Sequence, residues 1–233
     1  MGREIEAIAL QRGHTIIHKI DIDNRHLLQP ETLQQADVAI EFTSPHTAVS
    51  NIKACIEATV PVVVGSTGWY DKFEEVKALC EANNSTLFYA TNFSLGVNIF
   101  FELNKKLAQL MNTASGYEVS VTEIHHTAKL DAPSGTGITI AEGILQNYPR
   151  KKQWINTVGD EPIAHAADDL WIKSLRVDPA PGTHVVEYKS DVDRIEITHE
   201  AFSRRGFALG AILAAEFSAD KKGIFTMKDL LNL

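Results

Sequence analysis

Several features that would place the chain in a specialised class of protein are scarce or absent in its sequence. The 233 residues include only two cysteines, both in helical patterns, so no disulfide framework is expected. The longest apolar runs fall far short of the roughly 20 residues of a membrane-spanning helix, and no signal peptide is evident. The formal net charge of −8 argues against a nucleic-acid partner. We therefore expect a cytoplasmic protein with neither a membrane nor a nucleic acid as its partner.

The stretch Glu123–Gly137, which reads EIHHTAKLDAPSGTG, is the part of the chain richest in chemically useful side chains. Alternating β-branched residues in Tyr117–His126 predict a strand. His125 and His126 lie at its end and should point to opposite faces, because successive side chains alternate across a strand. Lys129 follows in a loop, where it could act as a cation or a proton donor. Together these residues could hold an anion and hand it a proton.

A helix start is expected directly after this loop. Asp131–Ser134 contains a proline suited to a first turn and side chains that cap helices. Gly135 lets a ligand approach the backbone closely, and the amides of Gly135 and Thr136 come before the first intrahelical hydrogen bond. A helix N-terminus of this kind binds carboxylate or phosphate. The sequence therefore predicts an anion site here.

Two other interpretations of this block are weaker. Zinc needs ligands that converge, but neighbouring histidines on a strand diverge and no spaced third ligand accompanies them, so no metal is predicted. Ser134 lacks the G-x-S-x-G context of a nucleophile. Adjacent histidines are commonly ordinary surface or core residues, but their combination with Lys129 and the SGT helix start favours a functional role.

This block resembles the signature of the 4-hydroxy-tetrahydrodipicolinate reductase family, also called dihydrodipicolinate reductase, of the diaminopimelate–lysine pathway. The family pattern is an acidic residue, an apolar residue, His-His, two variable residues, Lys, one variable residue and DAPSGTA. Gly137 stands where the family usually has Ala, a small-for-small change that is expected to matter little. The resemblance extends from Met1 to about Leu231.

The resemblance implies an oxidoreductase that uses NADH or NADPH to reduce 4-hydroxy-tetrahydrodipicolinate to tetrahydrodipicolinate. The catalytic residues would be Lys129, as the proton donor, and His125, as its acid/base partner. The same resemblance implies a cytoplasmic homotetramer. The two carboxylates of the substrate are expected to bind at His126, Ser134, Gly135, Thr136 and Arg204.

The first ninety residues alternate between strand-like and helix-like patterns. Short apolar, β-branched runs predict strands at Thr15–Asp21, Val38–Phe42, Val60–Val64 and Thr86–Ala90. Alternation of strands and helices predicts a parallel sheet covered by helices on both faces, in a Rossmann-like α/β domain. Ligands of such sheets bind beyond the carboxyl ends of the strands.

The residues at these strand ends suggest a dinucleotide site. Asp21 closes the first run, where an acidic residue can hold the ribose hydroxyls of a dinucleotide. It favours NADH, while Lys19 and Arg25 leave NADPH open. A glycine-containing strand end is by itself a weak signal, but four such segments occur in order. The resemblance implies cofactor contacts for Asp21 and for Phe42, Thr43, Gly65, Ser66, Thr67, Ala90, Thr91, Asn92 and Phe93.

The start of the sequence departs from a complete dinucleotide fold, which should open with a strand and G-x-G-x-x-G. The chain begins Met1-Gly2-Arg3-Glu4, which resembles the end of that motif, with Gly2 as the third, cofactor-binding glycine. The first strand and two glycines would then be missing. We expect a start site placed too late or a truncated sequence, and a chain of this length would have doubtful cofactor affinity.

From about Leu95 the pattern becomes that of an α+β domain with an open, mostly antiparallel or mixed sheet. Its later strands are expected at Trp171–Val177, Thr183–Ser190 and Arg194–Ala201, and the polar stretch Lys151–Asp169 is expected to be a loop. The resemblance assigns residues 1–94 with 205–233 to a dinucleotide-binding domain. It assigns residues 95–204 to a domain for substrate binding and oligomerisation.

A second function of a different class stays open at this point. The chain could be a non-catalytic dicarboxylate- or subunit-binding protein that has lost its cofactor loop. The missing glycines favour this alternative, whereas the intact HHTAK and SGT motifs favour the enzyme.

Overall fold

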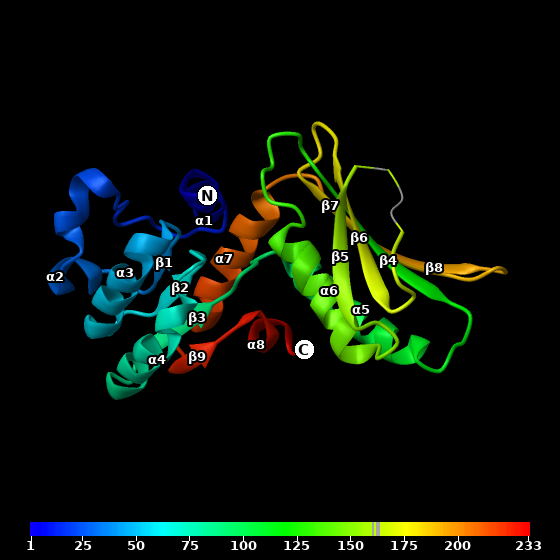
Figure 1. Cartoon of the computed structure of the whole chain (residues 1–233). Helices are drawn as coiled ribbons and strands as arrows, with labels where there is room; N and C mark the ends of the chain where they lie inside the picture. Colours follow the sequence, from blue (N-terminus) through cyan, green and yellow to red (C-terminus); the bar gives the residue numbers. More distant parts are fainter. Residues whose placement is uncertain (160, 162–163) are drawn as a thin grey trace. The chain divides into compact units, whose positions relative to one another are not determined.

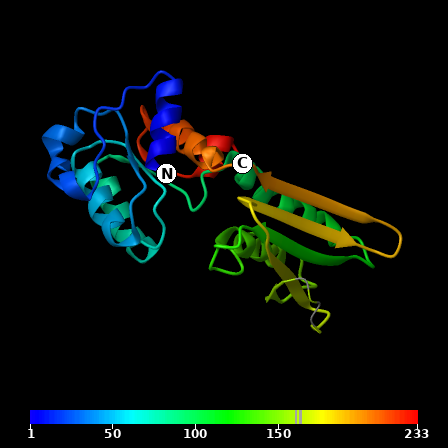
Figure 2. The ribbon, with the colours of Figure 1, turned by 90° about the horizontal axis from the view of Figure 1, so that it is seen from above.

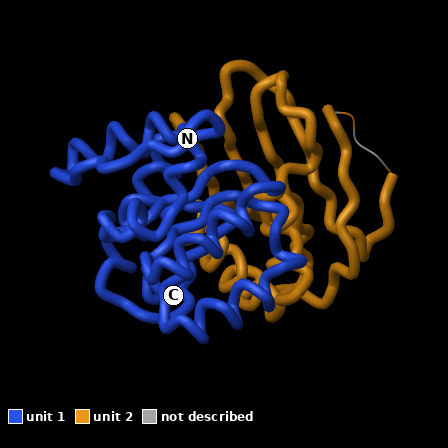
Figure 3. The backbone as a smooth tube through the Cα atoms, turned by 90° about the vertical axis from the view of Figure 1, so that its left-hand side faces the viewer, with its two compact units in different colours: residues 1–95, 204–233 blue, residues 96–203 orange. Residues whose placement is uncertain are grey.

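The computed structural model describes residues 1–159, 161 and 164–233. The chain divides into two compact units (Figure 3): unit 1 comprises Met1–Leu95 and Arg204–Leu233, and unit 2 comprises Gly96–Ser203. Each expected domain boundary lies one residue from the observed one. No helix in the described part of the chain combines the length and apolar character needed to cross a bilayer.

Unit 1 is built on a parallel sheet. Its strands are β1 (Ala39–Glu41), β2 (Val62–Val64), β3 (Thr86–Tyr89) and β9 (Gly223–Phe225), in the order β1-β2-β3-β9. Every neighbouring pair in this sheet is parallel. The strand β9 was not expected, because three residues are too few to show a period in the sequence.

Helices cover both faces of this sheet, as the alternating pattern predicts (Figure 1). Side chains of α3 (Pro45–Glu57) and α4 (Phe73–Ala82) pack with Val62, Val64 and Leu87 in one core. Side chains of α1 (Gly2–Gln11) and α7 (Arg205–Ser218) pack with Val63 and Phe88 in another. Although they are far apart in sequence, α1 and α7 lie side by side (Figures 1 and 2). This confirms the predicted parallel-sheet domain.

The remaining helices of unit 1 are short. They are the 3-10 helices Ile22–Leu27 and Tyr70–Lys72, α2 (Pro30–Leu33) and α8 (Met227–Leu231).

The prediction of a strand at Thr15–Asp21 is wrong, because this segment has no regular secondary structure. A strand exists only through hydrogen bonds to a neighbouring strand, and β1 pairs with β2 alone in the described part of the chain. The apolar, β-branched residues of the run therefore do not suffice to make it a strand.

Unit 2 is a five-stranded mixed sheet with helices on one face. The strand order is β5-β6-β4-β7-β8, parallel across β5-β6-β4 and antiparallel across β4-β7-β8. Apolar side chains of the helices α5 (Leu95–Met111) and α6 (Gly135–Asn147) pack against this sheet in a third core. The mixed sheet confirms the predicted α+β unit. Its strands are β4 (Glu118–His125), β5 (Gln153–Val158), β6 (Asp169–Arg176), β7 (Gly182–Lys189) and β8 (Arg194–Ala201).

The prediction that Lys151–Asp169 is a loop is wrong over Gln153–Val158, which forms β5. This strand lies at the edge of the described sheet, where it pairs with β6 on one side. Edge strands commonly carry polar side chains, and these hide the alternation on which a prediction from sequence depends. Asp160, Pro162 and Ile163 of the same stretch lie outside the described residues.

Candidate active site

The site is built on the buried face of β4. Val119, Val121, Glu123 and His125 alternate along this face, and all four are buried. The first two belong to the apolar core of unit 2, whereas Glu123 is a carboxylate with none of its surface exposed. Burying a charge is costly unless it is paired and hydrogen-bonded, so the surroundings of Glu123 must compensate for its burial.

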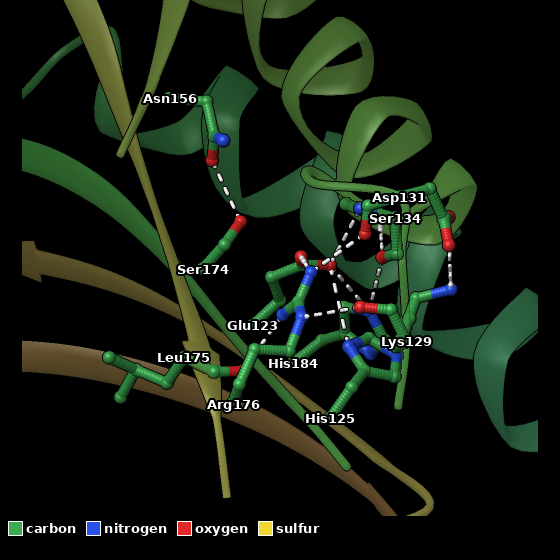
Figure 4. A network of polar contacts seen from close by, with 11 residues as sticks. Glu123, His125, Lys129, Asp131, Ser134, Asn156, Ser174, Leu175, Arg176 and His184 are labelled. Atoms are coloured by element: carbon green, nitrogen blue, oxygen red, sulfur yellow. Dashed lines mark hydrogen bonds and ion pairs between the residues drawn. The ribbon is translucent and has the colours of Figure 1, made fainter. Parts of the chain in front are cut away.

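The strands on both sides of β4 bring polar partners to Glu123. In the antiparallel pair with β7, Glu123 lies opposite His184, which is also buried. In the parallel pair with β6, Glu123 lies opposite Ser174, and His125 lies opposite Arg176. One face of three adjacent strands therefore gathers a carboxylate, two imidazoles and a guanidinium (Figure 4).

Both oxygens of the Glu123 carboxylate accept hydrogen bonds. The amide of Ser134 donates to Oε2 at 2.9 Å, and Arg176 Nη2 donates to Oε1 at 3.3 Å. Two further nitrogens lie somewhat farther from Oε2, with His125 Nδ1 at 3.6 Å and His184 Nε2 at 3.9 Å. We call Glu123, His125, Ser134, Arg176 and His184 the cradle.

Ser134 joins the cradle to the start of α6. Its side chain caps the helix by accepting from the amide of Gly137 at 3.0 Å, as the sequence predicts for this position. The same oxygen lies 3.2 Å from His184 Nε2. Because Ser134 Oγ is committed to these contacts, the helix presents a ligand with its first backbone amides, beginning with that of Gly135.

The glycine at position 137 has a consequence that the sequence did not indicate. A Cβ built there would lie 3.1 Å from Glu123 Oε2 and 3.3 Å from Ser134 Oγ. Such distances are tight, so an alanine would press on the carboxylate and on the cap together. Glycine leaves both atoms more room.

Arg176 fixes the loop that carries Lys129. Besides Glu123, its guanidinium donates to the carbonyl of Asp131 at 2.7 Å and to that of Lys129 at 3.4 Å. Five planar donors on one side chain allow this combination of contacts. Arg176 therefore couples the buried carboxylate to the loop between β4 and α6.

The ammonium of Lys129 forms an ion pair with Asp131, at 2.8 and 2.9 Å from its two carboxylate oxygens. The hydrogen bond from Lys129 lowers the pKa of Asp131. Asp131 is exposed, whereas the side chain of Lys129 is only 21% exposed. An anionic ligand could thus replace the weakly held Asp131 carboxylate at the ammonium.

Burial and hydrogen bonding set the charges in the cradle. Burial alone would raise the pKa of Glu123, but hydrogen bonds from Ser134 and Ser174 and the nearby His125 outweigh it, so the pKa is lowered. Burial lowers the pKa of His125 against the opposing effect of Glu123, and it lowers that of His184 to about 3. At neutral pH the cradle therefore holds an ionised carboxylate, a guanidinium and two neutral imidazoles.

Two residues expected near the substrate lie outside the cradle. His126 falls on the opposite face of the strand end from His125, near the exposed Asp178. Hydrogen bonds from Thr127 lower the pKa of Asp178, and His126 adds a smaller effect in the same direction. Arg204 is exposed and belongs to unit 1, at the N-cap of α7, although the expected domain boundary placed it in the substrate domain. Their roles as ligands stay predictions.

In unit 1 the expected cofactor segments follow three adjacent parallel strands. Phe42 and Thr43 follow β1, Gly65 and Ser66 follow β2, and Ala90–Phe93 follows β3. The Thr43 amide donates to Ser66 Oγ at 2.8 Å, and the rings of Phe42 and Phe93 lie 5.5 Å apart. Three of the predicted strand ends are therefore brought together.

The glycine after β2 has a steric reason within the protein itself. A Cβ at Gly65 would lie 2.1 Å from the ring of Phe42, so any side chain would force that ring to move. Glu41 is a buried neighbour that the sequence did not reveal, and its Oε1 accepts from the Thr43 amide at 3.1 Å. These segments fit a nicotinamide cofactor through backbone and small polar groups that a flat ring and its ribose can contact.

The other expected cofactor residues lie in different settings. Asp21 caps the 3-10 helix Ile22–Leu27, with Oδ1 accepting from the Ile22 amide at 2.7 Å. It lies in an irregular segment and not at the end of a strand. Gly2 is the first residue of α1, and a Cβ there would meet nothing within 4 Å. Thr67 and Thr91 are exposed, and Asn92 accepts from the Ser94 amide at 2.9 Å.

Potential metal ligands converge around His125, contrary to what the spacing of histidines along the chain predicts. His184 and Glu123 supply the converging ligands that the sequence does not place beside His125, and one ligand atom from each of the three lies within 4.8 Å of the others. However, the guanidinium of Arg176 already lies 3.3 Å from Glu123, and a divalent ion would add two positive charges beside it. The charges therefore favour protons and anions over a metal as ligands.

The sequence contains a signal for two of the missed cradle residues. Glu123 continues the buried register of Val119 and Val121, and His184 shares the register of Val186 and Tyr188. A polar residue in line with core residues of a strand has to be paired or functional. Arg176 also lies in line with the buried Leu170 and Ile172 of β6, but its partly exposed position at the end of the strand weakens that signal, and the pairing of β6 with β4 is needed to bring it to the site.

Comparison with known proteins agrees with this picture along the whole chain. The model for "Dihydrodipicolinate reductase, N-terminus" matches residues 1–93, and that for "Dihydrodipicolinate reductase, C-terminus" matches residues 96–231.

Three relatives that carry the name 4-hydroxy-tetrahydrodipicolinate reductase are similar over most of their length. The protein of Christiangramia forsetii is 48% identical, covering 100% of this chain and 94% of the relative. The protein of Methanococcus aeolicus is 36% identical, covering 91% and 77%. The protein of Neisseria gonorrhoeae is 33% identical, covering 98% and 84%.

Solved structures show the same fold at lower identity. Dipicolinate-bound dihydrodipicolinate reductase from Paenisporosarcina sp. TG-14 has a TM-score of 0.73 at 22% identity, covering 97% of this chain and 92% of that one. Amine dehydrogenase from Mycobacterium smegmatis has a TM-score of 0.57 at 14% identity, with the same coverage.

The fold has a parallel sheet in one unit and a mixed sheet in the other, and with the reductase names of the relatives it defines a two-unit α/β oxidoreductase. Within that class, the chain belongs to the dihydrodipicolinate reductase family. The alternative of a non-catalytic dicarboxylate- or subunit-binding protein finds no support in these matches.

Proposed function

We propose that the protein catalyses the NAD(P)H-dependent reduction of 4-hydroxy-tetrahydrodipicolinate to tetrahydrodipicolinate in diaminopimelate and lysine biosynthesis. One observation carries this proposal beyond family membership. The start of α6 is held by Glu123 and Ser134, and it lies in the same network as His125 and Lys129. A helix start with an adjacent cation suits a carboxylate, and a neutral imidazole suits proton transfer.

The substrate carries two carboxylates, and this chain offers several groups for them. The backbone amides at Gly135 and Thr136 would bind one carboxylate, with Ser134 fixing the turn from which they project. His126 is proposed as a contact of the other carboxylate, and the guanidinium of Arg204, in unit 1, stays a predicted source of positive charge for the substrate. Because the whole chain has a net charge of −8, such local positive groups are needed to attract a dianion.

Proton delivery is assigned to Lys129, with His125 as its acid/base partner. The ammonium would exchange Asp131 for the substrate and donate a proton to the ring. The positive charge of Lys129 contributes to the lowered pKa of His125, after the larger effect of burial, which favours the neutral imidazole that acid/base chemistry needs. A bound reduced nicotinamide would supply the hydride for the cyclic unsaturated imine that loss of water from the substrate leaves.

The cofactor is proposed to bind to unit 1 and the substrate to unit 2. Phe42, Thr43, Gly65, Ser66 and Ala90–Phe93 would contact the nicotinamide half, because ligands of parallel sheets bind at the carboxyl ends of the strands. Gly2, Asp21 and Thr67 complete the proposed contacts. Neither NADH nor NADPH is preferred by these residues, since Asp21 suits a ribose hydroxyl while Lys19 and Arg25 suit a phosphate.

We also propose a cytoplasmic homotetramer that assembles through unit 2. In Figure 1 the helices α5 and α6 lie on one face of the mixed sheet, and no helix of the described part of unit 2 lies on the other. That other face carries half-buried Trp171, Leu175 and Val185. Apolar side chains on an uncovered sheet face are suited to packing against a second copy.

The test is a titration of the purified chain with NADH and NADPH, followed by an assay of cofactor oxidation with 4-hydroxy-tetrahydrodipicolinate. We expect binding of at least one cofactor, turnover, and competitive inhibition by dipicolinate, the dicarboxylate bound in the Paenisporosarcina structure. Failure to bind either cofactor would refute the proposal. Sedimentation velocity checks the assembly, for which a monomer would be the contrary result.

A further inference from the structure

Glu123 is a fully buried carboxylate whose role the proposed reaction does not by itself explain. It accepts a hydrogen bond from the amide that precedes the start of α6, and it lies 3.6 Å from His125 Nδ1. It therefore lies between the two parts of the site that would act on the substrate, the anion-binding helix start and the acid/base imidazole (Figure 4).

The imidazole of His125 has one buried nitrogen that lacks a hydrogen bond. Nδ1 is buried and finds no hydrogen-bond partner among the described residues, while Glu123 Oε2 lies 3.6 Å from it. A distance of 3.6 Å is too long for a hydrogen bond, but catalytic contacts are often long in a ligand-free site and tighten when the substrate binds. A small rotation of the ring would satisfy Nδ1.

The opposite nitrogen of the ring is kept clear. A Cβ at Gly182 would lie 3.1 Å from His125 Nε2, so the glycine at that position leaves space beside this atom. If Nδ1 carries the proton and donates a hydrogen bond to Glu123, Nε2 is the unprotonated nitrogen. Nε2 is then the atom that can accept and return protons. This is the arrangement in which a third group orients a catalytic base.

Stability alone does not account for a carboxylate at this position. Replacing a buried ion pair with well-packed apolar residues is often neutral or stabilising, so the pair with Arg176 gives no reason of its own to keep Glu123. The three contacts of Oε2, with the Ser134 amide, His125 and His184, all involve groups of the site.

We propose that Glu123 is a positioning residue that holds the start of α6 through the Ser134 amide and holds His125 in the Nδ1–H tautomer, so that one carboxylate aligns the anion-binding and proton-transferring parts of the site. The catalytic part of this inference, that the alignment serves the reaction, rests on the proposed function. The inference also makes a separate structural claim about one imidazole that can be tested without turnover.

The first experiment uses the unmodified protein. In ¹⁵N-detected NMR of the complex with dipicolinate, His125 should show a protonated Nδ1 and an unprotonated Nε2, with its signals assigned by their loss in His125→Asn. The opposite tautomer, with the proton on Nε2, would overturn the proposal. This measurement does not depend on whether any Glu123 variant folds.

The second experiment compares two isosteric variants. Glu123→Gln should lower kcat by about 10- to 100-fold, the usual effect of removing a partner that orients a functional group. Its affinity for NADH or NADPH should not change, because those contacts are assigned to unit 1. Asp169→Asn is the matched control. Asp169 is a buried carboxylate at the opposite end of β6 from Arg176. Its oxygens accept hydrogen bonds from Gln153 Nε2 at 2.7 Å and from the Ala166 amide at 3.0 Å. This substitution should leave kcat unchanged.

The pH dependence separates positioning from mere support of the fold. The charged and titratable groups around His125 are Glu123 on its own strand, His184 on β7, Arg176 on β6, and Lys129 and Asp131 on the loop. Removing the charge of Glu123 should move the titration midpoint of His125 to lower pH by about one unit, because a nearby carboxylate favours the protonated imidazole. Asp169→Asn should leave that midpoint in place.

The results of these experiments distinguish the positioning role of Glu123 from the proposed function. A Glu123→Gln enzyme with the kcat and the His125 midpoint of the control would overturn the positioning role. If the unmodified protein lacks turnover but shows the Nδ1–H tautomer and the shifted midpoint, the proposed function fails and the positioning role stands. If Glu123→Gln does not fold, the tautomer in the unmodified protein decides.

Discussion

The two units carry their functional residues in different ways. In unit 1 the expected cofactor segments are the ends of three parallel strands, held by backbone and small polar contacts such as that of the Thr43 amide with Ser66. In unit 2 the cradle joins four charged or titratable side chains to Ser134. All of the cradle except the partly exposed Arg176 is buried, and its members depend on one another. The arrangement of the segments in unit 1 depends on the backbone of the sheet, whereas the arrangement of the cradle depends on the presence of each of its side chains.

This contrast teaches where substitutions should have effects. A strand end keeps its backbone direction when a nearby side chain changes, so single substitutions in unit 1 should act locally and sterically. A buried carboxylate that loses a partner becomes an uncompensated charge. Substitutions in unit 2 should therefore affect catalysis, stability and pH dependence together.

The largest effect is expected from Lys129→Ala. Loss of a general acid lowers kcat by about 10²–10⁴-fold, while cofactor affinity should stay the same because Lys129 belongs to unit 2. Steady-state kinetics and a fluorescence titration with NADH and NADPH measure the two quantities. An unchanged kcat would remove Lys129 from the mechanism and would weaken the division of roles between the units.

Arg176→Ala should destabilise the protein by about 3–5 kcal/mol, because it leaves Glu123 buried without its guanidinium partner. Urea unfolding gives the free energy. The matched control is Arg194→Ala, whose exposed contact with Glu187 at 3.4 Å should contribute no more than about 1 kcal/mol. Equal losses in the two variants would contradict the cooperative character of the cradle.

Gly65→Ala tests the steric character of unit 1. The new Cβ would collide with the ring of Phe42, so we expect a loss of stability of about 1–3 kcal/mol, with the cofactor affinity reduced as the ring moves. Gly206→Ala is the control in the same unit, since its Cβ would make only an ordinary contact with Ser94 Oγ at 3.8 Å. If Gly65→Ala matches the control, the ring has room that the structure does not show.

His184 should make stability depend on pH. Burial lowers its pKa to about 3 in the folded chain, below the usual 6.5 that it keeps when unfolded. Between these values the unfolded state binds the proton and the folded state does not, so stability falls as the pH drops below about 6.5. The loss is about 1.4 kcal/mol per pH unit, or about 2 kcal/mol at pH 5.

The comparison that checks this prediction is the slope of unfolding free energy against pH in His184→Gln. The variant should have a flatter slope between pH 6.5 and 5, whereas His46→Asn, at an exposed histidine of unit 1, should keep the slope of the unmodified protein. A slope unaffected by either change would show that His184 does not stay neutral in the folded chain.

The smallest effect is expected from removing metal ions. Although Glu123, His125 and His184 could offer three ligand atoms, the positive charge of Arg176 beside them disfavours a divalent ion. Dialysis against EDTA should leave kcat within experimental error. Loss of activity that added Zn²⁺ restores would show that the cradle is a metal site after all.

Much of the fold could be predicted from local pattern. The run Val62–Val64 and the alternation through Val119 and Val121 mark strands whose burial follows directly from side-chain period. Thr15–Asp21 has similar residues but pairs with no strand of the described part of the chain, and β5 is an edge strand in which polar residues interrupt the alternation. Both errors come from neighbours across the sheet, which no local window contains.

The candidate site was predictable in its sequence-local part only. His125, Lys129 and the Ser134 cap lie within ten residues of one another, so their association is visible in the chain. His184 and Arg176 arrive through the register of β4 with β7 and β6. His184 is 61 residues from its partner Glu123, and Arg176 is 51 residues from its partner His125. The burial of Glu123 could be predicted from its register with Val119 and Val121, but which residues contact it could not.

The route of the chain also has a consequence for how the protein is made. Unit 1 is interrupted at Leu95 and resumes at Arg204, so α7 and the strand β9 are added after all of unit 2. On the ribosome, unit 2 is complete while the parallel sheet still lacks its final strand and a helix of one face. Because domains generally fold as units during synthesis, the nascent inserted unit is the first that can reach its native state.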